Sequence, residues 1–170
     1  SRILGKVAIK EGYDVKVSEV HGMSQRGGSV VTYVKYGDKV YSPIIDRGEA
    51  DLILAFEMLE AMRALPYLKK GGKMIANTQK MNPMPVITGA MEYPENIEEK
   101  LSAKINLQAV DALSLAEKAG TIKAVNVVLI GLLAKSMDVD KNVWIDVIKE
   151  TVPEKFLDVN IKAFELGYEL

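Results

Sequence analysis

The chemically versatile side chains of this chain are concentrated in one short segment, His21–Gly28, between two runs rich in β-branched residues. The segment contains the only histidine of the chain together with an arginine, a glutamine and a serine. A guanidinium such as that of Arg26 can hold a carboxylate or a phosphate through two hydrogen bonds, and glycine lets the backbone approach a ligand or another chain closely. The candidate binding residues here are His21, Gly22, Met23, Ser24, Gln25, Arg26, Gly27 and Gly28. The alternative is a glycine-rich turn in which His21 and Arg26 only satisfy nearby carbonyl groups, and spacing alone does not separate the two.

Several kinds of catalytic chemistry are excluded by the residues that the chain lacks. It has no cysteine and one histidine, so it cannot form a disulfide, hold an iron–sulfur cluster through thiolates, use a cysteine nucleophile or build a histidine-rich zinc site. A Ser-His-Asp triad could use only His21, and no Gly-x-Ser-x-Gly motif accompanies it. Any redox cofactor would therefore have to belong to another chain.

Composition predicts one globular domain. The chain has 170 residues, of which 48% are hydrophobic and 26% are charged, with a formal net charge of −1, which are ordinary values for a globular protein. So small a net charge gives no bulk electrostatic reason to bind nucleic acid or an anionic membrane. The longest apolar stretch, Ala124–Ala134, is too short to span a bilayer. Residues 1–6 resemble an amphipathic helix rather than a signal peptide, so we expect a cytoplasmic protein.

The order of apolar patterns predicts the elements that position these residues. Strands are expected at 15–20, 29–36, 39–41, 51–56, 73–77 and 105–109, with a further short strand at 86–87. Helices are expected at 2–12, 57–68, 97–103, 111–119, 124–135 and 140–150, with a final helix opened by a capping box at 151–154. The alternation predicts the α/β class: a three-layer single domain over residues 1–170, with a mixed, mostly parallel sheet, helices on both faces and a helical C-terminal third.

Polar residues follow three of the expected strands. If strands 15–20, 51–56 and 73–77 are parallel neighbours, their carboxyl ends share one edge of the sheet, where ligands bind in open α/β folds. That edge would bring the His21–Gly28 segment together with Glu57, Asn77 and Thr78. The structural alternatives are a favourable acidic group in a helix first turn for Glu57 and a simple side-chain-stabilised turn for Asn77-Thr78.

Methionines gather in the proline-rich stretch 79–94, which contains Met81, Met84 and Met91. Methionine fills irregular gaps in cores but also makes adaptable contact surfaces. Because these three lie in a loop-rich stretch, we interpret them as a contact surface rather than as core.

The segment Glu19–Val30 closely resembles the signature of the gamma-type domain of 2-oxoacid:ferredoxin oxidoreductases, with the indolepyruvate branch as the nearest match. The same resemblance extends, in the order of the family, over 50–57, 59–61, 63–68, 71–72, 77–78 and 126–131. The family normally begins with a strand and a glycine-rich loop before its first helix. We therefore expect this sequence, which starts at Ser1 inside that helix, to lack both.

The resemblance implies a subunit of an enzyme that oxidatively decarboxylates 2-oxoacids, here an arylpyruvate such as indolepyruvate, to acyl-coenzyme A and passes the electrons to ferredoxin. It implies that thiamine diphosphate, Mg²⁺ and the iron–sulfur clusters belong to a larger partner subunit, through which ferredoxin is reached, and that coenzyme A binds in the complex. This chain would bind none of these alone, would contribute no catalytic residue and would be inactive alone. Two alternatives stay open: a self-sufficient nucleotide-binding enzyme, although the Gly-x-Gly-x-x-Gly spacing is absent, and a purely structural adaptor.

Overall fold

The computed structural model describes residues 1–21 and 30–170. It divides into two compact units. The first unit contains residues 1–19, 32–45 and 112–170, and the second contains residues 20–31 and 46–111.

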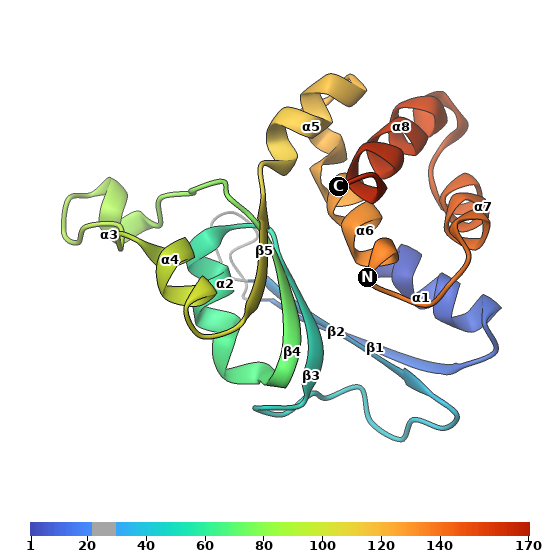
Figure 1. Ribbon diagram of the computed structural model, residues 1–170, viewed down its shortest axis with the longest axis horizontal. Helices are drawn as coiled ribbons and strands as arrows, with labels where there is room; N and C mark the ends of the chain where they lie inside the picture. The colour runs from blue at the N-terminus through green and yellow to red at the C-terminus, as the bar shows by residue number, and fades with distance from the viewer. Residues whose placement is uncertain (22–29) are drawn as a thin grey trace. The chain divides into compact units, whose positions relative to one another are not determined.

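The second unit is built on a three-stranded parallel sheet in the order β3-β4-β5 (Figure 1), with β3 at Ala50–Ala55, β4 at Leu68–Asn77 and β5 at Asn106–Val110. Parallel neighbours require a crossover connection. The first crossover contains α2 (Met58–Ala64) and the 3-10 turn η1 (Leu65–Tyr67). The second contains α3 (Met84–Ile87) and α4 (Ile97–Ser102). All three strands therefore end at the same edge, which we call the carboxyl edge.

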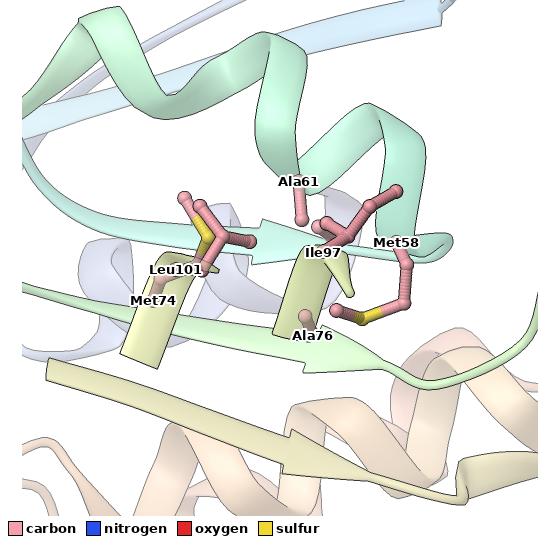
Figure 2. Close-up of a cluster of buried hydrophobic side chains, with 7 residues drawn as sticks. Met58, Ala61, Met74, Ala76, Ile97 and Leu101 are labelled. Carbon is pink, nitrogen blue, oxygen red and sulfur yellow. The ribbon is translucent and has the colours of Figure 1, made fainter. Parts of the chain in front are cut away.

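A hydrophobic core holds α2 and α4 against this sheet. Figure 2 shows Met58 and Ala61 of α2 and Ile97 and Leu101 of α4 gathered over β4. From β4 come Met74 and Ala76, which point to the same face because side chains alternate along a strand. Every one of these residues is buried, so burial of apolar area fixes the two helices on the sheet.

The first unit is mostly helical. It contains α1 (Arg2–Lys10), α5 (Ala112–Ala119), η2 (Ile122–Ala124), α6 (Val125–Lys135), α7 (Lys141–Thr151), η3 (Glu154–Phe156) and α8 (Leu157–Tyr168). The strands β1 (Asp14–His21) and β2 (Val30–Gly37), which belong to this unit up to Glu19 and from Thr32 onward, pair with each other in a two-stranded sheet. Among the helices that the structure describes, none has the length and apolar character needed to cross a membrane.

Helices α6 and α8 lie side by side (Figure 1), and they approach each other at two glycines. A Cβ atom on Gly131 would lie 2.2 Å from the carbonyl oxygen of Phe164, and one on Gly167 would lie 2.0 Å from that of Val128. Both distances are far inside van der Waals contact, so only glycine permits this approach. The sequence-based expectation that residues 124–135 form a buried helix is confirmed, since the stretch from Val127 to Ala134 is buried.

The α/β class, the parallel sheet and the helical C-terminal part are confirmed. The expectation that the strand at 15–20 would be a parallel neighbour of those at 51–56 and 73–77 is wrong in its first part, because β1 pairs with β2 in a separate sheet. Apolar alternation marks a strand but does not identify its partner.

Four local predictions also differ from the structure. Residues 39–41 form no strand, and residues 86–87 belong to α3, whose first turn starts after Pro83. The expected helix at 57–68 ends at Ala64, because Pro66 lies in the 3-10 turn that leads into β4. The expected capping box at 151–154 is absent, because Thr151 is still the last residue of α7 and α8 begins only at Leu157.

The glycine contact between α6 and α8 gives a test of the packing in the first unit. We expect Gly131→Ala to lower the free energy of unfolding by about 3 kcal/mol, because the added methyl group would overpack the helix contact. Gly5 in α1 is the matched control, because a Cβ there would lie 3.6 Å from Val17 Cγ2, at ordinary contact distance. Gly5→Ala should therefore stabilise by about 0.5–1 kcal/mol, because alanine favours the helix more than glycine does and the added methyl group fits. Equal effects of the two substitutions in urea titrations would contradict this packing.

Candidate functional site

Three of the sequence-predicted site residues meet at the carboxyl edge of the parallel sheet. Glu57 lies between β3 and α2, Asn77 is the last residue of β4 and Thr78 follows it. His21 is the exposed last residue of β1. The other predicted residues, Gly22 to Gly28, lie outside the residues that the structure describes.

Glu57 is buried, with 3% of its surface exposed, and both of its carboxylate oxygens accept hydrogen bonds. Oε2 accepts from the backbone N–H of Glu60 at 3.0 Å, which makes Glu57 the N-cap of α2. Oε1 accepts from the backbone N–H of Met81 at 3.3 Å and from the hydroxyl of Tyr93. A buried carboxylate is costly unless donors surround it, and here three donors, two of them backbone groups, do so. We call this arrangement the Glu57 clasp.

Tyr93 is a member of the site that sequence reasoning missed. Burial, followed by the hydrogen bond to Glu57 and the charge of Glu57, raises the pKa of Tyr93 well above its ordinary value of 10.0. Its hydroxyl therefore remains protonated and donates to the carboxylate. The ammonium group of Lys80 lies 5.7 Å from the centroid of the Tyr93 ring, within cation–π range. Tyr93 lies 36 residues beyond Glu57, and no local spacing signals such a pair.

Asn77 joins the end of β4 to the end of β3. It is fully buried, and its Nδ2 donates to the carbonyl oxygen of Phe56 and to Oε1 of Gln79, both at 3.3 Å. The backbone reinforces this connection, because the N–H of Met58 donates to the carbonyl oxygen of Gln79 at 3.3 Å. The N–H of Thr78 donates to the carbonyl oxygen of Val110 at 2.9 Å and so extends the pairing of β4 with β5. Glu57 and Asn77 therefore organise the carboxyl edge.

A cleft of about 500 Å³ opens beside this edge. Thr78, Lys80, Asn96 and Ser102 contribute polar groups to its lining, Glu98 and Glu99 contribute acidic groups, and Met58, Pro94 and Ile97 contribute apolar surface. The volume falls in the range of small-molecule sites. Thr78 is thus a predicted site residue that lines this cleft, whereas the carboxylate of Glu57 is already engaged by its donors.

The methionine-rich stretch projects large apolar side chains into solvent. Met81 is 54% exposed, Met84 63% and Met91 65%, and Ile87 in the same stretch is 64% exposed. We call these four residues the methionine surface. Exposed apolar groups that gather in one stretch, rather than singly, are typical of a contact surface. The Glu57 clasp ties down both ends of this stretch, at Met81 and at Tyr93.

The donor set does not suit a metal or an iron–sulfur cluster. In the part of the chain that the structure describes, no three histidine, cysteine, aspartate or glutamate side chains converge as metal ligands would. The whole sequence contains no cysteine, and thiolates are the ligands that iron–sulfur clusters require. No step of cofactor chemistry is therefore assigned to these residues.

Removing the Glu57 clasp tests how much it contributes to the stability of the fold. We expect Glu57→Ala to lower the free energy of unfolding by about 1–3 kcal/mol, because two backbone donors and a tyrosine hydroxyl lose a buried acceptor. Tyr93→Phe, which removes one hydrogen bond, should cost about 1 kcal/mol. Glu60→Ala is the matched control, since the Glu60 side chain forms an ion pair with Arg63 at the surface and its removal should change stability by less than about 1 kcal/mol. Chemical denaturation measures all three, and a Glu57→Ala variant as stable as Glu60→Ala would refute the clasp.

Comparison with known proteins identifies relatives along the whole chain. The family model described as pyruvate ferredoxin/flavodoxin oxidoreductase matches residues 1–170. The chain is 44% identical to the indolepyruvate oxidoreductase subunit IorB of Pyrococcus horikoshii, over 98% of this chain and 86% of the relative. It is 43% identical to the IorB subunit of Thermococcus kodakarensis, with the same coverage.

A solved structure shares the fold at lower sequence identity. The gamma subunit of a keto/oxoacid ferredoxin oxidoreductase from Geobacter sulfurreducens superposes with a TM-score of 0.69 at 22% identity, over 98% of this chain and 86% of that one. The resemblance noted from the Glu19–Val30 segment is therefore confirmed, as is the expectation of an oxidoreductase component that acts with 2-oxoacids. The chain belongs to the pyruvate ferredoxin/flavodoxin oxidoreductase family.

Proposed function

We propose that this chain is the gamma-type, non-catalytic subunit of a cytoplasmic indolepyruvate (arylpyruvate):ferredoxin oxidoreductase, and that its two units work together as one domain. The observation that supports this most directly is the match to the family over residues 1–170, with IorB relatives more than two-fifths identical. In the complex, 2-oxoacids are oxidatively decarboxylated to acyl-coenzyme A, and ferredoxin receives the electrons.

The cofactors of this reaction belong to a larger partner subunit in our proposal. The thiamine diphosphate with its Mg²⁺ supplies the decarboxylation chemistry there, and the iron–sulfur clusters lead electrons to ferredoxin. The absence of cysteine from this chain supports that division. So does the Glu57 carboxylate, because its engagement by three donors suits a structural role better than proton transfer.

The work of this chain is to contact the partner and to complete the surroundings of its active site. We propose that the methionine surface docks on the larger subunit, because flexible, polarizable methionines adapt to a partner and the Glu57 clasp holds both ends of the stretch. Thr78 would face the contact from the carboxyl edge, with Glu57 and Asn77 positioning it. The segment His21–Gly28 would add Ser24, Gln25 and Arg26, which would orient partner backbone or an anionic group of substrate or coenzyme A.

Weakening the methionine surface tests the docking proposal. We expect Met84→Ser combined with Met91→Ser to raise the dissociation constant of the complex with the larger subunit about tenfold or more, since truncating a side chain that is a hot spot at the centre of an interface costs about 2 kcal/mol or more. The matched control is Ile122→Ser in the first unit, which also removes an exposed apolar side chain and should leave the dissociation constant unchanged. Surface plasmon resonance measures both, and identical affinities would exclude this surface.

Reconstitution tests the function itself. The chain, co-expressed or mixed with candidate larger subunits, should support coenzyme A-dependent reduction of a viologen dye with indolepyruvate in preference to pyruvate or 2-oxoglutarate. Arg26→Ala separates the proposal from the alternative of a purely structural adaptor. A higher Michaelis constant for substrate or coenzyme A in the assembled enzyme indicates contact with an anionic group, whereas weaker assembly with unchanged constants indicates the adaptor. Turnover by the isolated chain, or saturable binding of NAD(P) or ATP in calorimetry, would contradict the proposal.

A further inference from the structure

The end of the parallel sheet opposite the carboxyl edge contains a second recess, lined by lysines. It has a volume of about 380 Å³ and lies where β4 and β5 begin. Lys69, Lys70 and Lys104 line it, together with Gly71, Gly72 and Asn106. This recess lies entirely within the second unit. It shares Ser102 with the cleft at the carboxyl edge, but neither Thr78 nor Lys80.

An irregularity in the sheet builds this recess. Ala50 of β3 pairs with Leu68 of β4, but Leu52 pairs with Lys73, so two positions along β3 correspond to five along β4. The extra residues of β4 bulge out of the regular ladder, as β-bulges do. Gly71 adopts a φ of +82°, which favours glycine. A Cβ on Gly72 would come within 2.9 Å of the carbonyl oxygen of Asp51. The bulge thus depends on two glycines and places two consecutive lysines at the recess.

The charges of the recess are only partly balanced. The ammonium group of Lys69 forms an ion pair with Asp51, with Nζ 2.9 Å from Oδ1. Within the described part of the chain, the ammonium groups of Lys70 and Lys104 have no ion-pair or hydrogen-bond partner. The unpaired ammonium groups of Lys70 and Lys104, together with that of Lys69, therefore border a recess of ligand size. A multiply charged anion bound there could neutralise them together.

We propose that this lysine-lined recess binds a phosphate-bearing ligand through Lys70 and Lys104, and through Lys69 once it exchanges Asp51 for the ligand. Lysine is a common binder of phosphate as a point charge. A single carboxylate could neutralise only one of the unpaired lysines, whereas adjacent phosphate groups neutralise both. The shared chemistry of the ligand is thus at least two negative charges on neighbouring phosphate oxygens, in a free oligophosphate or in a lipid headgroup. The proposal rests on the recess alone and is independent of the proposed function.

Calorimetric titration of the chain with inorganic pyrophosphate at low ionic strength tests this. We expect saturable binding that weakens as salt is added. The double variant Lys70→Gln, Lys104→Gln should weaken it about tenfold, because each substitution removes one attractive charge. The matched control, Lys118→Gln with Lys123→Gln, changes two exposed lysines of the first unit and should bind as the unaltered chain does.

Asp51→Asn gives a second, opposite readout. This substitution frees Lys69 from its ion pair and should strengthen pyrophosphate binding about threefold, because a competing negative charge is removed. A fold defect cannot imitate such a gain. Sedimentation with vesicles of phosphatidylcholine and phosphatidic acid then assigns the source: co-sedimentation that depends on Lys70 and Lys104 indicates a headgroup, and its absence indicates a soluble ligand. No pyrophosphate binding, or binding that neither Lys70→Gln, Lys104→Gln nor Asp51→Asn changes, would overturn the proposal.

Discussion

The carboxyl edge of the second unit depends on one buried negative charge. Only 3% of the surface of Glu57 is exposed to solvent, and a carboxylate so deeply buried is stable only while donors surround it. Two of those donors are backbone amides, at Glu60 and Met81, and the third is the hydroxyl of Tyr93. Because these donors come from the first turn of α2, the exit of β4 and the far end of the proline-rich stretch, one side chain fixes three segments that are distant in sequence.

This constraint explains how a stretch with so little regular structure can present a defined surface. The stretch from Met81 to Met91 contains only the single short helix α3, and its apolar side chains point to solvent rather than into the core cluster of Figure 2. It gains little from burial of its own. The clasp at Glu57 and the buried amide of Asn77 supply the attachment instead. In our proposal, partner contact depends on this attachment, while cofactor chemistry stays with a larger subunit.

Sequence patterns predicted those parts of the fold that have local causes. Short apolar runs identified β3 and the later part of β4, and a longer continuous apolar run identified the buried helix α6. Partner choice was not predictable from such patterns: β1 pairs with β2 rather than with the parallel sheet. For the site, sequence correctly brought Glu57, Asn77 and Thr78 to one edge because strand ends converge there. It did not reveal that Tyr93 and the Met81 amide occupy the Glu57 carboxylate, because hydrogen bonds between distant residues leave no spacing signal.

Amide hydrogen exchange at Met81 tests the central role of the Glu57 carboxylate most directly. This N–H belongs to no strand or helix of the described chain, and its acceptor is the Glu57 side chain. We expect the Met81 amide to be protected in the unaltered chain and to exchange freely in Glu57→Ala, while the amide of Ile75, deep in β4, stays protected in both. A Met81 amide that exchanges at the same rate with and without the carboxylate would contradict the account.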